Sequence, residues 1–217
     1  GHEDLIDHLT VSPDGMWVAT FSEDQTIILW STKDGSAALE LTPRAAIQGD
    51  TPFSPDSKHL GMYCKDRRSR RTGTAGGSSD ASSWQHHRPR WLTLFFPDGT
   101  KVLSYVRSYY TSSRSHPAIV SVWNTTTGGH ILSLEAHARD VSVVAISPDG
   151  EYIAIASSRP VNLRVWRARV GTCLGVFTEH SVEVTHLMFS RDGETLCSAS
   201  KDGYVCIRRM REIVSRG

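Results

Sequence analysis

Short, mostly apolar runs, four to seven residues long, alternate along the chain with tight-turn sequences. The runs are rich in β-branched and aromatic residues, and the turns in Pro, Asp and Gly, which is typical of strands joined by hairpins. In the first repeat the runs are 5–11, 16–21, 26–30 and 37–41. This pattern predicts four antiparallel strands, with no amphipathic helix of useful length.

The same arrangement recurs further along the chain. Strands are expected at 91–95, 101–105, 119–123 and 130–134, and again at 141–146, 152–156, 163–166 and 172–177. A turn motif sets the period: it begins at Ser12, Ser54, Phe96, Ser147 and Ser190, at intervals of 42, 42, 51 and 43 residues. Four short strands in a period of about 42 residues predict an all-β array of propeller blades.

The Gly1-His2 opening, the Ser-Pro-Asp-Gly turn and the closing sequence Ser22 to Trp30 resemble the WD40-repeat β-propeller family. The resemblance covers nearly the whole chain and implies about five four-stranded antiparallel blades. We expect one array over residues 1–217, with repeats near 1–43, 44–85, 86–136, 137–179 and 180–217. The second and fifth repeats are degenerate and the last is truncated. Two arrangements are open, a closed five-bladed ring or an incomplete segment of a longer array.

The resemblance also implies a structural tetrad of His, Ser or Thr, Asp and Trp within a blade. Its members by position are His2, Thr20, Asp24 and Trp30, then His86, Ser104 and Trp123, then His137 and Trp166, and finally His180, Ser198 and Asp202. Such groups are costly to bury unless they bond to one another. Because the set recurs, whereas an active site occurs once, we interpret it as structural and not as a nucleophilic triad.

Several repeats depart from the family pattern. Ile155 and Arg159 replace the hydroxyl and the Asp of the fourth repeat, and Arg208 replaces the Trp of the fifth. The third repeat has a nine-residue excess near 108–116. A fourth strand of the fifth repeat would have to come from 210–216.

The second repeat departs most. Arg44 replaces its His and Met62 its hydroxyl, and its third strand is replaced by an arginine-rich sequence. We expect this blade to lose its outer half, with residues 65–85 forming a loop or an irregular excursion on the surface.

The net charge of the chain limits the classes of partner that are expected. The chain has 24 basic and 23 acidic residues, a net charge of +1, which argues against wholesale nucleic-acid binding. The basic cluster at 65–71 leaves a nucleic-acid or phosphate contact open as an alternative, although no aromatic residues lie among its arginines. No apolar run approaches the roughly 18 residues of a membrane span, so no membrane association is expected.

Four cysteines without a CxxC pair predict reduced, buried thiols in an intracellular protein, cytoplasmic or nuclear. A disulfide between Cys197 and Cys206 across one hairpin is open. Zinc at His86, His87 and His116 is a further alternative, without a thiolate at suitable spacing. No cofactor is expected.

We therefore expect a non-catalytic scaffold that presents propeller loops to a protein or peptide, as part of a larger signalling or regulatory protein whose other domains are further partners. An enzyme at the channel mouth is an alternative with little support from the residues. The resemblance places turns between second and third strands, and links between blades, on one rim. The candidate rim residues are Glu3, Asp4, Glu23, His87, Arg139, Asp140, Arg159 and Lys201.

Overall fold

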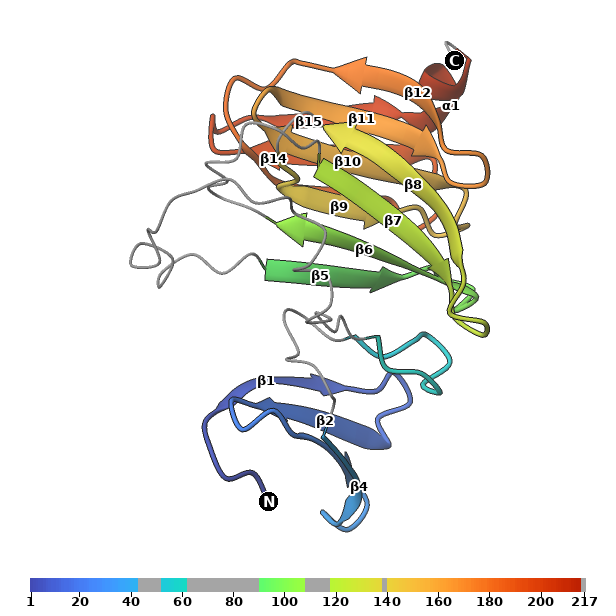
Figure 1. Ribbon diagram of the computed structural model, residues 1–217. Helices are drawn as coiled ribbons and strands as arrows, with labels where there is room; N and C mark the ends of the chain where they lie inside the picture. The colour runs from blue at the N-terminus through green and yellow to red at the C-terminus, as the bar shows by residue number, and fades with distance from the viewer. Residues whose placement is uncertain (43–51, 62–89, 108–117, 138–139, 216–217) are drawn as a thin grey trace, which may run out of the picture. The chain divides into compact units, whose positions relative to one another are not determined.

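The computed structural model describes residues 1–42, 52–61, 90–107, 118–137 and 140–215 (Figure 1). The chain divides into two compact units, Gly1–Phe95 and Phe96–Gly217. In the described residues every regular element except one short helix is a β-strand, and the strands form four antiparallel sheets. The described part of the protein is therefore all-β apart from that helix, and its sheets have the antiparallel sequential strand order expected of propeller blades.

The first sheet pairs its strands in sequence order, β1-β2-β3-β4. Its strands are β1 (Ile6–Val11), β2 (Trp17–Ser22), β3 (Ile27–Ser31) and β4 (Ala37–Leu41). The register places Thr20 opposite both Leu9 and Ile28, so alternate residues of three strands share a face. Ala19, Phe21 and Ile27 are buried on the opposite face, where Phe53 and Leu60 pack against them.

The remaining sheets follow the same order. The strands are β5 (Arg90–Phe95), β6 (Lys101–Arg107), β7 (Ala118–Asn124) and β8 (His130–His137); then β9 (Val143–Ile146), β10 (Tyr152–Ser158), β11 (Val161–Arg167) and β12 (Thr172–Phe177); then β13 (Val184–Phe189), β14 (Thr195–Ser200) and β15 (Val205–Arg209). The last sheet has three strands, and the other two have four. The predicted strands are confirmed, with ends that differ by at most three residues.

The turn motif has one geometry in the four repeats in which it begins with serine. The Ser12 hydroxyl donates to the Asp14 carboxylate over 2.5 Å and accepts the Trp17 amide, and the Gly15 amide donates to the Ser12 carbonyl. Gly15 has a φ of 71°, a left-handed conformation that costs glycine little. The same 2.5 Å bond recurs at Ser54, Ser147 and Ser190. This local chemistry sets where each first strand turns back.

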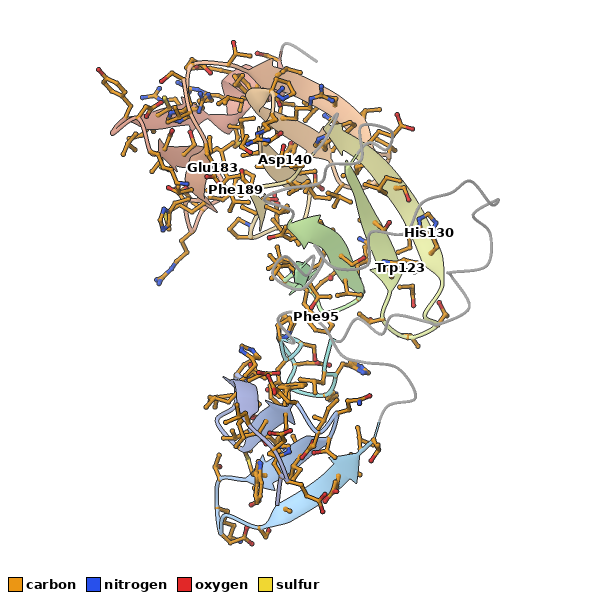
Figure 2. The ribbon with its side chains drawn as sticks, turned by 60° about the vertical axis from the view of Figure 1, so that its left-hand side comes forward. Phe95, Trp123, His130, Asp140, Glu183 and Phe189 are labelled. Atoms are coloured by element: carbon orange, nitrogen blue, oxygen red, sulfur yellow. The ribbon has the colours of Figure 1, made fainter. Side chains whose placement is uncertain are left out.

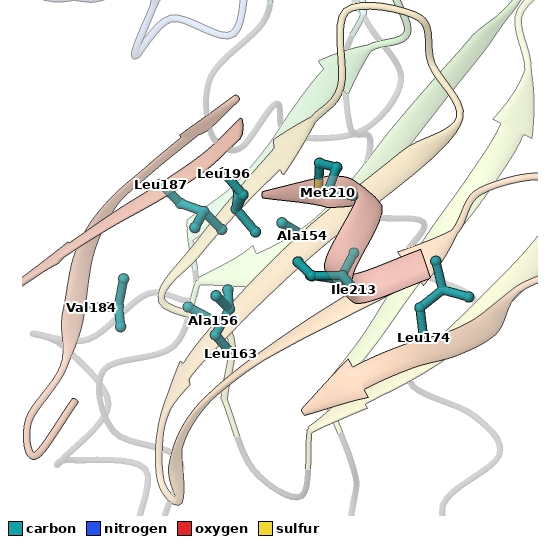
Figure 3. Close-up of a cluster of buried hydrophobic side chains, with 10 residues drawn as sticks. Ala154, Ala156, Leu163, Leu174, Val184, Leu187, Leu196, Met210 and Ile213 are labelled. Atoms are coloured by element: carbon teal, nitrogen blue, oxygen red, sulfur yellow. The ribbon is translucent and has the colours of Figure 1, made fainter. Parts of the chain in front are cut away.

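The main core of the second unit lies between the sheet β9–β12 and the sheet β13–β15 (Figure 3). Its buried residues are Ala154, Ala156, Leu163, Val165, Leu174, Val184, Leu187, Leu196, Met210 and Ile213. The last two belong to α1 (Met210–Val214), which follows β15 directly. The expected fourth strand at 210–216 is therefore wrong for 210–214, because a helical turn buries both apolar side chains against the sheets.

The structure decides one open alternative and corrects one prediction about the cysteines. Cys197 lies opposite Ile207, whereas Cys206 lies opposite Ser198, so the two thiols point to opposite faces of the sheet and no disulfide joins them. The described cysteines are free, but Cys173 is exposed and the other two are partly exposed, so the expectation of buried thiols is wrong for them.

The second repeat is described only at 52–61, where Phe53 and Leu60 form an isolated bridge. The excursion predicted at 65–85, the excess at 108–116, Cys64 and the residues proposed for zinc lie outside the described residues.

Candidate functional site

The first sheet joins its predicted tetrad through one additional residue. The Thr20 hydroxyl lies 2.6 Å from His2 Nε2 and accepts a bond of 2.8 Å from Trp30 Nε1. At the other end of the imidazole, Nδ1 lies 2.7 Å from the Thr26 hydroxyl, which donates to Asp24 over 2.6 Å. His2 and Asp24 themselves are 3.7 Å apart. Thr26, which is not a member of the expected tetrad, therefore lies between His2 and Asp24.

The bond directions follow from what each group can donate. Trp30 can only donate, so the Thr20 oxygen accepts from it, and the Thr20 hydroxyl faces both His2 Nε2 at 2.6 Å and the Ile28 carbonyl at 3.4 Å. The Thr26 hydroxyl donates its hydrogen bond to Asp24, so its oxygen accepts a hydrogen bond from His2 Nδ1–H. The hydrogen bond from the Thr26 hydroxyl lowers the pKa of Asp24, and the amides of Glu3 and Thr26 lower it further. The brace thus ends on an ionised carboxylate.

The last sheet builds the same brace with an arginine at the Trp position. His180 Nδ1 lies 3.1 Å from Asp202, and its Nε2 lies 2.9 Å from the Ser198 hydroxyl. Arg208 donates to the same hydroxyl over 3.1 Å, and its other nitrogen pairs with Glu179 at 2.8 Å. The guanidinium carbon also lies 4.8 Å from the centre of the Phe177 ring. A charged bond and a cation–π contact therefore replace the indole.

The two carboxylates of this brace ionise easily. Burial raises the pKa of Asp202, but bonds from the Tyr204 and Ser181 amides and from His180 outweigh it and leave the pKa lowered. Burial also opposes ionisation of Glu179, whose pKa is lowered by its own amide and by Arg208. Both groups are therefore stabilised as anions in the folded chain.

The middle sheets hold partial braces. Trp123 Nε1 donates to Ser104 over 2.9 Å, and its ring meets His130 edge-on at 5.1 Å (Figure 2). The residues expected as their histidines, His86 and His137, lie beyond the side chains that the structure describes. In the fourth repeat Ile155 is fully buried at the position where the other braces have a hydroxyl. No described residue therefore accepts a hydrogen bond from the buried Trp166 Nε1.

Asp140 has a supporting role that sequence reasoning missed. It is 7% exposed, and its carboxylate accepts the Ser157 hydroxyl at 2.7 Å, the Arg159 amide at 3.1 Å and the Ser158 hydroxyl. The expectation that Asp140 presents its charge on the rim is wrong, because these bonds hold the carboxylate inside. The turn β10–β11 is thus fixed by a residue that precedes β9.

The rim of the first unit is acidic. The Glu23 amide donates to the Leu5 carbonyl, and the Ser22 hydroxyl donates to the Asp4 carbonyl, so the segment before β1 lies against the turn β2–β3. Glu3, Asp4 and Glu23 are exposed there, beside Leu5, which is 69% exposed. This part of the rim therefore carries three exposed acidic residues close in the chain or through backbone bonds to an exposed apolar one.

The last sheet repeats this backbone arrangement with different charges. The Lys201 amide donates to the Glu183 carbonyl, and the Ser200 hydroxyl to the Val182 carbonyl, as Glu23 and Ser22 do in the first sheet. The Lys201 and Glu183 side chains form an ion pair of 2.5 Å, and Glu183 is labelled in Figure 2. Arg159 is exposed at the turn β10–β11. His87 and Arg139 lie outside the described residues.

A Ser-His-Asp set alone does not make this brace a catalytic site. Ser198 is 1% exposed, so its hydroxyl is closed to a substrate, and it already bonds to both His180 and Arg208. Within the described residues no cluster of three or more His, Cys, Asp or Glu side chains could hold a metal ion. None of the described helices is long and apolar enough to cross a membrane.

Comparison with known proteins identifies the repeats. The WD domain, G-beta repeat model matches residues 1–31, 128–159 and 171–208, which include the braces of the first and last sheets. These three segments are therefore WD40 repeats, and repeats of this family generally mediate protein–protein interaction and are generally non-catalytic.

One curated relative is the U3 small nucleolar RNA-associated protein 13 of Saccharomyces cerevisiae, 42% identical over 41 residues. That match covers 19% of this chain and 5% of the yeast protein. It is about the length of one repeat, so it supports the repeat and carries no argument about the whole yeast protein.

Proposed function

We propose that this chain is a non-catalytic protein-binding module that recognises its partner through the exposed turns at the rim. The observation that carries this proposal is the shared backbone arrangement at the turns β2–β3 and β14–β15. The same hydrogen bonds hold both turns, yet one displays Glu23 and the other Lys201. A constant support with variable charges suits polar recognition of a protein or peptide.

The braces supply the rigidity that such recognition needs. Asp24 and Asp202 each accept a backbone amide from the segment before the first strand, at 2.7 Å from Glu3 and 3.0 Å from Ser181. In each of the two sheets the Asp in the turn between the second and third strands is thus bonded to the segment that precedes the first strand. Because both parts of the rim are held in place, less conformational entropy is lost when a partner binds.

The partner chemistry differs between the two units. In the first unit we expect a partner with a basic surface, because the exposed rim residues there are acidic. We also expect the partner to place an apolar group over Leu5, because desolvated contacts dominate binding hot spots. In the second unit Arg159 and the Lys201–Glu183 pair favour a mixed or acidic surface. An intracellular location, nuclear or cytoplasmic, stays a prediction, and so does membership of a larger signalling or regulatory protein.

Affinity capture with charge-reversed variants tests the proposal. The variants are Glu23→Arg and Lys201→Glu, each compared with the wild-type chain by quantitative mass spectrometry of the captured proteins. Lys33→Glu is the matched control, because Lys33 is exposed in the turn β3–β4, at the other end of β3 from Glu23.

We expect the captured amount of at least one specific partner to be about tenfold or more lower with a rim variant than with the wild-type chain. A decrease of this size matches the loss of one strong interfacial charge pair. The same partner should be retained by Lys33→Glu. Identical partner sets for all four proteins would contradict the proposal.

A further inference from the structure

The last sheet leaves one strand edge open. In the other three sheets the third strand pairs on both sides: β3 with β2 and β4, β7 with β6 and β8, β11 with β10 and β12. Among the described residues β15 pairs only with β14. An unpaired edge presents a row of backbone donors and acceptors to other chains.

The hydrogen bonds of the ladder show which groups face outward. The Ser200 amide donates to the Tyr204 carbonyl over 3.2 Å, and the Met210 amide donates to the Glu194 carbonyl over 2.8 Å. Hydrogen-bonded pairs alternate in an antiparallel ladder, so the backbone groups of Cys206 and Arg208 also face β14. Those of Val205 and Ile207 therefore face the open edge.

The residues that follow β15 do not fill this edge. They form α1, in which Met210 is 4% exposed and Ile213 is 3% exposed within the core of the second unit. Figure 3 shows both side chains directed at the sheets. Drawing this segment out as a strand would expose both, so the chain's own next residues stay in the helix.

Both faces beside the edge offer room for side chains. Val205 is 64% exposed and Ile207 is 69% exposed on one face. A cavity of about 180 Å³ lies beside Arg208, between β12, β15 and α1. Its lining residues are Phe177, Glu179, Arg208, Arg209, Glu212 and Ile213.

We propose that β15 accepts an extended strand from a protein partner, which pairs antiparallel with Val205 and Ile207 as β4, β8 and β12 pair with their own third strands. Backbone hydrogen bonds supply most of the affinity, and alternate side chains supply selectivity. Aliphatic residues are expected on the face of Val205 and Ile207, and one side chain at the cavity. The proposed strand site shares no residue with the candidate rim, so the two proposals are independent.

A peptide copying residues 129–137 is the probe, because it contains β8, a fourth strand of this same chain. In β8, Leu132 lies opposite Val122 and Leu134 opposite Val120. The Thr125 amide donates to the Thr100 carbonyl, so by the same alternation Val120 and Val122 direct their backbone groups to β8. The amides of Leu132 and Leu134 are therefore the ones that should bond to β15.

Binding is measured by fluorescence anisotropy of three labelled peptides: the unmodified sequence, one N-methylated at Leu132 and Leu134, and one N-methylated at Ser133 and Glu135. We expect the second to bind about tenfold or more weakly, since two backbone bonds are lost, and the third to bind within about twofold of the unmodified peptide. In hydrogen exchange, the unmodified peptide should protect the Val205 and Ile207 amides.

Ile207→Pro removes one outward N–H and should weaken binding, whereas Ile207→Ala should retain most of it. Unchanged protection of the Ser200 and Met210 amides shows that the variant sheet is intact. If the proline variant fails to fold, the N-methylated peptides still decide the question.

The proposal is overturned if the unmodified peptide fails to bind, or if both N-methylated peptides bind equally well. It is also overturned if hydrogen exchange shows the Val205 and Ile207 amides protected without any peptide. That result would mean that the edge is already covered, by the chain itself in a dilute monomer or by a second copy of the chain. Glu23→Arg and Lys201→Glu should leave peptide binding unchanged, so failure of the rim proposal and failure of this one are distinguishable.

Discussion

The first and the last sheet carry the same brace with one side chain exchanged. In the first, Trp30 gives Thr20 a single neutral hydrogen bond. In the last, Arg208 gives Ser198 a charged bond, pairs with Glu179 and lies over Phe177. The position of Glu179, directly before the brace histidine, is held by Gly1 in the first repeat.

This difference shows how the brace tolerates a departure from the family pattern. A buried cation is costly unless an anion and further hydrogen bonds compensate it. Arg208 meets both conditions through Glu179 and Ser198, whereas Gly1 supplies no carboxylate to a cation at position 30. The departure in the last repeat is therefore a coupled exchange and not a loss of the brace.

Transferring the arginine alone should have the largest effect. Trp30→Arg places a cation beside Thr20 without the carboxylate that Glu179 provides, and we expect the first unit to lose about 3 kcal/mol of unfolding free energy. Native-state hydrogen exchange in β2 and β3 measures it. Trp30→Phe, which removes only the donor, is the control and should cost about 1 kcal/mol. Equal losses for both variants would contradict the coupled exchange.

Removing the shared hydroxyl should have the next largest effect, and it should differ between the sheets. Ser198→Ala leaves His180 and the charged Arg208 without their common partner, for an expected loss of about 2 kcal/mol. Thr20→Val keeps the shape of the side chain and leaves only neutral groups without a hydrogen-bond partner, so the expected loss of unfolding free energy is about 1 kcal/mol. Exchange of amides in β14 and β2 reports each loss separately. A larger loss at Thr20 would reverse the ranking that the charge implies.

Restoring the family residue should change stability little. In Arg208→Trp the indole can donate to Ser198, while the ion pair with Glu179 is lost, so we expect the unfolding free energy to move by less than about 1 kcal/mol. The salt dependence should change more clearly, because only the wild-type brace contains a screened ion pair. Urea unfolding at low and high sodium chloride measures both. Equal salt dependence in the two proteins would show that the ion pair contributes nothing measurable.

Acid should weaken both braces, with the smallest separate contribution from Glu179. The pKa values of Asp24, Asp202 and Glu179 are lowered by folding, so their stabilisation is present above the unfolded values near 4 and is lost as the pH falls below them. Glu179→Gln should reduce this acid dependence in the second unit alone, by less than about 1 kcal/mol because Glu179 is half exposed. Hydrogen exchange at pH 3 and pH 6 compares the units; a change in the first unit would contradict it.

The regular parts of the molecule could be read from the sequence because their causes are local. The turn at Ser12 needs only Ser, Asp and Gly at fixed spacing, and its hydrogen bonds join residues within five positions of one another. The apolar run around Thr20 predicts one strand from its composition alone. Where the motif weakens, as at Ser54, the turn itself persists.

The brace was only partly predictable. His2, Thr20 and Trp30 follow from their positions in the repeat, but nothing in the spacing shows that Thr26 lies between His2 and Asp24. Glu179 was not expected as a partner of Arg208, although a carboxylate directly before the histidine is a signal that could have been used. Asp140 was expected on the rim because it lies in the link between two blades, but its carboxylate is buried by its hydrogen bonds to Ser157 and Ser158.

The sequence by itself therefore determined the repeat period, the turns and the strands, since each depends on neighbours a few residues away. Only the tertiary structure decided the fate of residues 210–214 and of Asp140. Met210 and Ile213 form a helix because the space they fill lies between two sheets, and Asp140 is buried because Ser157 and Ser158 meet it there. These outcomes depend on surfaces that are created when distant strands pack together.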